Sequence, residues 1–298
     1  MKAFAFWMFF CFNLAALAVG PQRKIAFERG DNVWIANLDG TAVKKIADGS
    51  LPNISPDGTR LAFNTSADSK TRPGPERHIA VADLATGKVT IFKDIPSDNC
   101  FGPVWSPDGS RLAFSIMAEK EWRLGLVNAD GSGFRFVRNA ELKSDAFGAP
   151  TWARDSKSIF CHDLYNLYHI DLDGNVLKKW ELSKVLTEAG MNSNNRLTVS
   201  LDEKTLLMDV DLGAEQERKN WDGPQPAIYQ FDLATEKTAR VTGKNDFVWD
   251  PCWLTNDEFL CLIQKENENQ PSLYRMPIDG KNPKLLAKHA RTPSVSAP

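Results

Sequence analysis

The feature that most constrains this chain is a string of residues that recurs along its length. Pro103–Phe114 reads PVWSPDGSRLAF, and Pro52–Phe63 reads PNISPDGTRLAF, which matches it position by position. Shorter copies open at Pro150-Thr151-Trp152 and at Pro251-Cys252-Trp253, and a degenerate copy runs from Val199 to Met208. The period is about 50 residues, which indicates one supersecondary unit repeated along the chain.

Each copy predicts two strands joined by a tight turn at its Ser-Pro-Asp-Gly core. Proline presets φ at the second turn position, aspartate bonds the backbone ahead of it, and glycine takes the left-handed corner. A third strand follows a polar loop, as at Leu124–Leu126, and a fourth follows an Asp-Gly turn, as at Phe134–Val137. Four strands at this period predict one blade of a β-propeller.

The two ends of the chain predict how the ring closes. Residues Ile25–Ile46 contain three strands of a blade that lacks its first strand, and Thr292–Ser296 resembles a first strand without a blade. Joining them adds a sixth blade to the five repeats and removes two exposed sheet edges. We therefore predict an all-β, six-bladed propeller of four-stranded antiparallel blades, closed by the C-terminal strand. The alternative is a five-bladed ring with a disordered tail.

The first residues have the layout of a secretory signal. Lys2 precedes the apolar run Ala3–Phe12, and Ala16-Leu17-Ala18 supplies a small-residue cleavage site. We predict a signal peptide over residues 1–18 and a single propeller domain over residues 19–298, located in the periplasm or secreted. The apolar run is short for a membrane span, so we expect none after signal removal, although an uncleaved anchor is the alternative.

Net charge and cysteine content indicate which partners are excluded and whether disulfides stabilise the fold. The net charge is −2 and the isoelectric point about 6.1, which argues against a nucleic-acid partner; we expect a monomer. Without Cys11, four cysteines remain, which are too few for a disulfide framework. Cys252 and Cys261 lie on adjacent predicted strands and can pair if they face each other, whereas a register shifted by one residue forbids the bond.

The repeat resembles the TolB-like (WD-like) β-propeller family of exported bacterial proteins. Trp105–Phe114 carries the resemblance, Ile54–Phe63 is a second good copy, and the repeats cover nearly all of the mature chain. The resemblance implies a binding platform and no particular activity, because the fold hosts many unrelated functions. TolB has a further domain before its propeller, whereas only residues 19–24 precede the first predicted strand here, so the resemblance leaves open whether the chain acts in the Tol system.

A register of short polar residues is the best candidate for a binding site. Asp98, Asp145 and Asp246 each lie five positions before the motif proline, and Asn192 holds the same place in the degenerate repeat. Loops from a fourth strand to the next first strand approach the channel at one face, so these side chains could converge there. They would suit a cationic group or a divalent ion. Alternatively, each of these side chains accepts hydrogen bonds from backbone N–H groups of its own loop.

Aromatic residues in the same loops extend this predicted channel mouth. Phe101, Phe147 and Trp249 would form an amphipathic binding surface if they were exposed together. The alternative is that they fill the gaps between neighbouring blades.

Two classes of function fit the sequence. The first is a non-enzymatic, exported module that binds a peptide, protein or saccharide at its channel face and requires no cofactor, although a divalent cation in the channel is compatible with it. The second is a metal-assisted small-molecule enzyme, a lyase or a lactone hydrolase. No blade repeats a histidine, which favours the first class.

Overall fold

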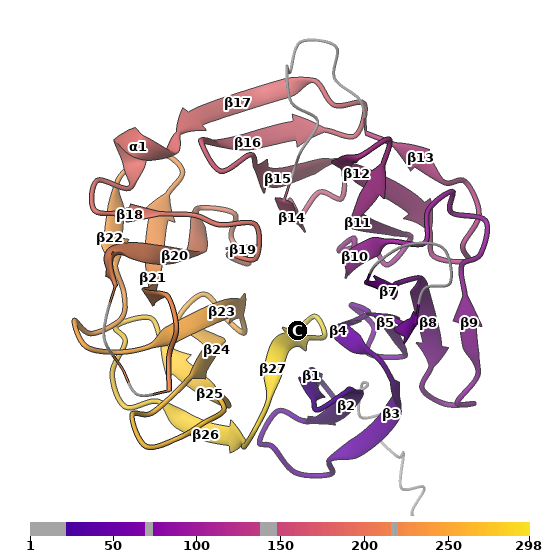
Figure 1. The fold of residues 1–298 in the computed structure, drawn as a ribbon, viewed down its shortest axis with the longest axis horizontal. Coiled ribbons are helices and arrows are strands. Elements are labelled where there is room, and N and C mark those ends of the chain that lie inside the picture. Colours follow the sequence, from indigo (N-terminus) through magenta and orange to yellow (C-terminus); the bar gives the residue numbers. More distant parts are fainter. Residues whose placement is uncertain (1–21, 69–73, 138–147, 216–217, 219) are drawn as a thin grey trace, which may run out of the picture.

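The computed structural model describes residues 22–68, 74–137, 148–215, 218 and 220–298. Six antiparallel sheets radiate from a central channel, and a single helical turn, α1 (Leu182–Val185), lies outside them (Figure 1). The prediction of an all-β, six-bladed propeller is confirmed. The predicted signal peptide lies outside the described residues.

Each sheet is one blade, and its strands are ordered from the channel outward. Blade 1 consists of β27 (Arg291–Val295), β1 (Lys24–Arg29), β2 (Asn32–Asn37) and β3 (Lys44–Asp48). Blade 2 consists of β4 (Ser50–Ile54), β5 (Arg60–Asn64), β8 (Ile79–Asp83) and β9 (Val89–Ile91). Between β5 and β8, β6 (Ala67–Asp68) and β7 (Pro75–Glu76) form a separate hairpin.

The next two blades follow the same order. Blade 3 consists of β10 (Cys100–Trp105), β11 (Arg111–Ala118), β12 (Glu121–Asn128) and β13 (Arg135–Phe136). Blade 4 consists of β14 (Gly148–Trp152), β15 (Ser158–His162), β16 (Asn166–Asp171) and β17 (Val176–Glu181).

Blade 5 differs from the others because its inner strand is split. Its strands are β18 (Ala189–Gly190), β19 (Leu197–Val199), β20 (Thr205–Glu215), β21 (Pro224–Asp232) and β22 (Thr238–Arg240). Both β18 and β19 pair with β20, so residues 191–196 leave the sheet between them. Blade 6 consists of β23 (Val248–Trp253), β24 (Glu258–Ile263), β25 (Ser272–Pro277) and β26 (Lys284–Ala287).

The C-terminal strand closes the ring as predicted. In blade 1, β27 pairs antiparallel with β1 through Ile25↔Val295 and Ala26↔Ser294, and Figure 1 shows these two strands side by side. Ser294 also reaches the next blade, because its Oγ accepts a hydrogen bond from the Ile54 backbone N–H at 3.1 Å.

The hydrophobic core lies between the blades. Among the described residues the buried apolar side chains form six clusters, and each cluster is shared by two neighbouring blades. The repeated tryptophan supports these contacts: the Nε1 of Trp105, Trp152 and Trp253 donates to a carbonyl on the inner strand of the preceding blade, at 3.0, 3.1 and 3.2 Å. The tryptophan position of the repeat is therefore an inter-blade contact.

The Ser-Pro-Asp-Gly string forms the turn that the sequence predicts. Ser55 Oγ donates to Asp57 Oδ1 at 2.5 Å and accepts from the Arg60 backbone N–H at 2.9 Å. Gly58 has φ +68°, in the left-handed region. Ser106 and Asp108 repeat this arrangement in blade 3.

The hypothesis of a Cys252–Cys261 disulfide is wrong. Cys252 lies opposite Leu260, so Cys261 is one residue out of register. The two side chains consequently enter different inter-blade clusters. Cys100 and Cys161, the other described cysteines, are also free thiols.

Candidate functional site

The channel is lined by the proline position of every repeat. This position projects from the innermost strand of each blade and is occupied by Pro52, Pro103, Pro150, Leu197, Pro251 and Pro293. Proline fits there because an innermost strand is a sheet edge that needs no N–H donor on its open side.

The position just before the proline adopts a left-handed backbone in five of the six blades. Its φ values lie between +42° and +65°, at Ala149, Thr292, Leu51, Asp250 and Gly102. The strand pairing shifts at each of these points, as a β-bulge requires. For residues other than glycine this backbone costs about 1 kcal/mol each. Four non-glycine residues with this strained backbone, Leu51, Ala149, Asp250 and Thr292, therefore lie where the strands enter the channel.

One end of the channel opens into a cavity of about 300 Å³, which we call the mouth cavity. Blade 5 supplies much of its wall, because the residues between β18 and β19 turn into the opening. The lining residues that concern its chemistry are Phe101, Asn192, Asn195, Arg196, Asp209, Asp211, Trp221, Trp249 and Asp250.

Three carboxylates and one guanidinium set the electrostatics of the mouth cavity. Arg196 Nε lies 3.0 Å from Asp250 Oδ1, and Asp211 Oδ2 accepts from Asn192 Nδ2 at 2.5 Å. Asp209 is 3% exposed. Burial and the neighbouring charge of Asp250 raise the pKa of Asp209 well above its ordinary value, although the Asp250 backbone N–H opposes the shift.

A fourth carboxylate, Glu28, braces two bulges beside the mouth cavity. Its Oε2 accepts from the Leu51 backbone N–H at 3.1 Å and from Thr292 Oγ1 at 3.4 Å. Burial raises the pKa of Glu28, whereas the Leu51 hydrogen bond and the charges of Arg291 and Arg196 lower it.

An aromatic wall faces these polar groups. The rings of Trp221 and Trp249 are 5.2 Å apart at an interplanar angle of 58°, and Phe247 packs edge-on against Trp221 at 5.3 Å. Trp221 Nε1 already donates to the Pro224 carbonyl at 2.8 Å. Trp221 therefore offers the mouth cavity its ring rather than its N–H.

The structure brings together three of the seven residues predicted for the site. Phe101, Asn192 and Trp249 line the mouth cavity. Asp98 is half-buried in the loop before β10, where its carbonyl accepts from the Arg77 backbone N–H at 2.7 Å. Asp145 and Phe147 lie outside the described residues.

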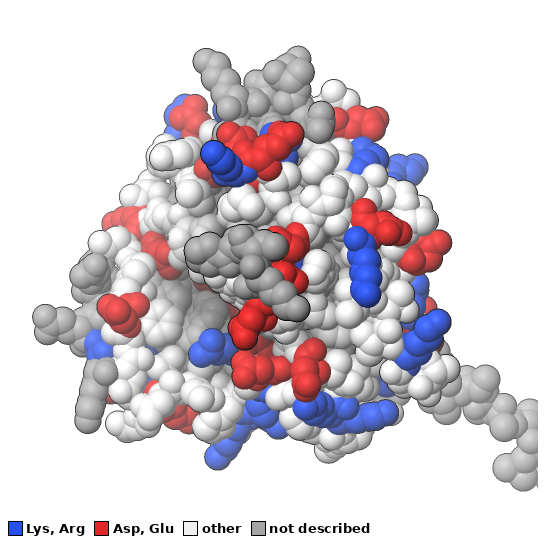
Figure 2. Space-filling model, turned by 45° about the vertical axis from the view of Figure 1, so that its right-hand side comes forward, with Lys and Arg blue, Asp and Glu red and all other residues white. Residues whose placement is uncertain are grey.

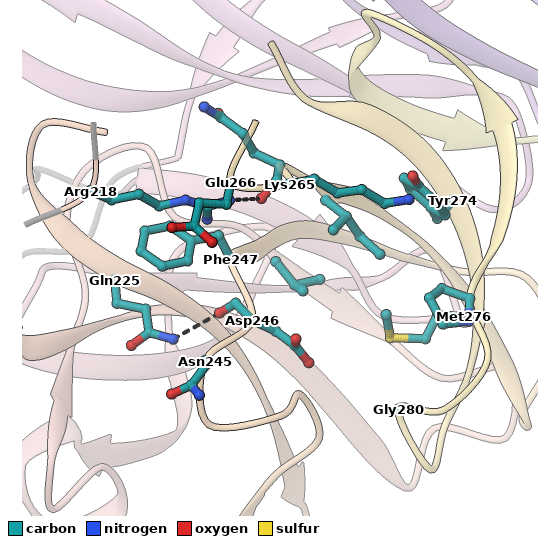
Figure 3. A pocket seen from close by; sticks show the side chains of 14 residues that line it. Arg218, Gln225, Asn245, Asp246, Phe247, Lys265, Glu266, Tyr274, Met276 and Gly280 are labelled. Carbon is teal, nitrogen blue, oxygen red and sulfur yellow. Dashed lines mark hydrogen bonds between the residues drawn. The ribbon is translucent and has the colours of Figure 1, made fainter. Parts of the chain in front are cut away.

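Asp246 lies in a different place, a cavity of about 540 Å³ between blades 5 and 6 that we call the side cavity (Figure 3). Its Oδ2 accepts from the Gly243 backbone N–H at 2.8 Å, and its carbonyl accepts from Gln225 Nε2 at 2.8 Å. Arg218 lies over the Phe247 ring at 4.2 Å in the same wall. Asp246 and Asn192 both lie five positions before the proline position, but they line different cavities.

Comparison with known proteins identifies the architecture. No family model matches the chain. Over 109 residues it is 30% identical to tricorn protease homolog 1 of Streptomyces coelicolor, which covers 35% of the chain. Over 136 residues it is 27% identical to the protein TolB homolog of Chlorobaculum tepidum, which covers 41%. The matched stretches span only 10% and 29% of these two curated relatives.

Among solved structures, TolB from Acinetobacter baumannii superposes with a TM-score of 0.67 at 17% identity, over 94% of this chain and 67% of that one. The chain has the fold of a TolB-like propeller. The nidogen/laminin complex gives a TM-score of 0.65 at 11% identity over 92% of the chain and 98% of that one. An oligogalacturonate lyase in complex with manganese gives 0.53 at 16%, over 86% and 72%.

In the described part of the chain, no three His, Cys, Asp or Glu side chains are placed so that they could hold a metal ion. The described residues contain no helix with the length and apolar character of a membrane span.

On the side of blades 2 and 3, acidic and basic side chains are interspersed (Figure 2).

Sequence reasoning missed the residues that define the mouth of this TolB-like propeller. Arg196 and Asp250 occupy the position immediately before the proline position, and Asp209 lies on the second strand of blade 5. One signal was available: in the degenerate repeat the polar run Asn192–Arg196 stands where the other repeats lead directly into an inner strand.

Proposed function

We propose that this TolB-like propeller is an exported, non-enzymatic module that binds a ligand at the mouth cavity. The observation that carries the proposal is the composition of that cavity, in which the half-buried rings of Trp221 and Trp249 face the carboxylates of Asp209, Asp211 and Asp250. Concave sites with an apolar wall and a few convergent polar groups are the usual form of ligand sites.

The ligand class that we favour is a peptide or a protein segment, with a saccharide as the other candidate. The nidogen/laminin structure is a propeller in a complex, which supports a protein ligand by analogy of fold alone. Aromatic rings beside carboxylates would also suit the face and hydroxyl groups of a sugar.

The binding proposal is tested with a library of short peptides and a library of oligosaccharides, screened against the purified protein by ligand-observed NMR. We expect hits for the wild type that disappear in Trp249→Ala, because that ring forms part of the aromatic wall. Tyr165→Ala is the control, since Tyr165 is 78% exposed and lies outside the mouth cavity. Hits that survive in Trp249→Ala, or no hits in either library, would contradict the proposal.

A metal-assisted enzyme is the second candidate, and its support is the fold shared with the manganese-bound oligogalacturonate lyase. The described residues do not fit a metal site of three or more such ligands, so we derive no metal-dependent step. Unsaturated products formed from oligogalacturonate in the presence of Mn²⁺ would favour this candidate over a binding module.

Export of the chain is the part of the proposal that rests on the sequence alone. Lys2, the apolar run and Ala16-Leu17-Ala18 predict a mature start at Val19. The intact mass of the soluble protein from the native host checks this. A soluble protein that retains Met1 would contradict cleavage.

A further inference from the structure

Asp209 is a buried carboxylate that is incompletely satisfied by the protein. Its Oδ2 is 3.4 Å from the Asp250 backbone N–H, a long contact, and the Asn195 side chain interacts with the carboxylate so as to lower its pKa. Its Oδ1 has no hydrogen bond of good geometry to any described residue. The side chain is 3% exposed and lines the mouth cavity. A buried acceptor that is incompletely satisfied is costly, so the carboxylate is positioned for a further donor.

The surroundings of Asp209 specify the charge of that donor. Asp250 and Asp211 lie in the same cavity, and Arg196 is the single guanidinium that lines it among the described residues. Arg196 already forms an ion pair with Asp250 at 3.0 Å, and Asn192 donates a hydrogen bond to Asp211 at 2.5 Å. Like charges confined at low dielectric repel, so a positively charged donor beside Asp209 and Asp250 would relieve both the repulsion and the missing hydrogen bond.

The aromatic wall indicates that the cation is organic. Trp221 and Trp249 present ring surface to the cavity, and a cation over the face of an indole is attracted by its quadrupole. A metal ion would instead require several oxygen or nitrogen ligands around it, and no such group of three acidic, His or Cys side chains exists among the described residues. An ammonium group offers three N–H donors and tolerates an apolar neighbour.

We propose that the mouth cavity takes its ligand by a primary ammonium group, which donates to Asp209 and Asp250 while the substituent of the amine packs on Trp221 and Trp249. The inference rests on the proposed function, since it concerns the same cavity. An aliphatic or arylalkyl amine and the N-terminus of a peptide share this chemistry, and both are compatible with a cavity of about 300 Å³.

The test compares two probes of nearly equal shape by isothermal titration calorimetry: 2-phenylethylammonium chloride and the neutral 2-phenylethanol. We expect the ammonium to bind the wild type about tenfold or more tightly than the alcohol, because charge-assisted hydrogen bonds are the strong ones. Asp209→Asn should remove most of that preference while retaining the fold, because asparagine has nearly the same shape and cannot ionise to pair with the ammonium. Asp246→Asn, in the side cavity, should keep the preference.

A second arm identifies the source of the ammonium group. The peptide Phe-Ala-Ala-amide is titrated with a free and with an acetylated N-terminus. Tighter binding of the free peptide than of 2-phenylethylammonium would assign the site to peptide N-termini, and the reverse order would assign it to small amines. Either result requires that acetylation weakens the peptide.

The outcomes separate this inference from the proposed function. Equal affinity for the ammonium and the alcohol, lost in Trp249→Ala, would overturn the ammonium inference and leave the binding module standing. A preference for the ammonium that persists in Asp209→Asn would also overturn it. If neither probe nor peptide binds, the inference fails, and the library screen then decides whether the proposed function fails with it.

Discussion

At the scale of single residues, Asp209 and Asp108 show how one residue type is used in two opposite ways. Asp209 is buried among other carboxylates, and burial is the main cause of its raised pKa. Asp108 lies in a repeat turn, where burial opposes ionisation but hydrogen bonds from Ser106 and Ser110 lower its pKa overall. The first aspartate works against folding when it is ionised, and the second supports folding.

This difference predicts opposite responses to pH. The folded state holds the Asp209 proton more tightly than the unfolded chain does, so its stabilising contribution is complete below pH 3.8 and is lost as pH rises through the raised value. The free energy of unfolding of Asp209→Asn, relative to that of the wild type, should therefore increase as pH rises from about 4 to about 8. Urea unfolding across that range measures the gain.

Asp108→Asn is the matched control, because the change of atoms is the same. Because the pKa of Asp108 is lowered in the folded state, its ionised carboxylate stabilises the protein at pH values above its ordinary pKa. The variant should therefore be less stable than the wild type at neutral pH. If the difference in free energy of unfolding from the wild type changes with pH in the same direction for both variants, the assignment of opposite roles is wrong.

At the scale of elements, the repeated tryptophan links the inner strands of blades 3, 4 and 6 to the inner strand of the preceding blade. Trp105 is 6% exposed, and its Nε1 donates to the Asn53 carbonyl at 3.0 Å. Trp105→Phe keeps a ring in the cluster and leaves that carbonyl without its donor, so we expect a loss of about 1 kcal/mol in the free energy of unfolding. Denaturant titration measures it.

Trp34→Phe serves as the comparison for this prediction. Trp34 Nε1 donates to the Arg29 carbonyl of the same blade at 3.3 Å, in a partly buried setting where water can replace it. A loss in Trp34→Phe that equals the loss in Trp105→Phe would show that the inter-blade position carries no special weight.

Strands could be predicted from the sequence because the turn chemistry is local. Ser55, Asp57 and Gly58 specify the hairpin by themselves, and the apolar runs on both sides follow from it. The site could be predicted only in part, because a register counted along loops assumes equal paths. Asp246 is bound in a turn with Gly243, whereas Asn192 lies on the excursion between β18 and β19, so the two diverge.

At the scale of the whole molecule, the core of the described part of the ring consists of the six inter-blade clusters. Each blade is consequently stabilised by both neighbours, as in other repeat architectures. Blade 1 is the point at which the chain closes on itself, because its inner strand β27 comes from residues Arg291–Val295 and its other strands from the start of the propeller. Stability and the mouth cavity therefore both depend on one non-local strand.

Removal of that strand gives the last prediction. A chain ending at Lys288 lacks β27, which exposes β1 as an edge, leaves the Ile54 N–H without Ser294 and removes Thr292 from Glu28. We expect the melting temperature to fall by about 5 °C or more. A peptide of residues 289–298 added in excess should restore part of the loss, because an open edge accepts a matching strand. Removal of Pro298 alone is the control and should change little. A chain ending at Lys288 that melts like the wild type would show that β27 is dispensable and that the ring is stable with blade 1 incomplete.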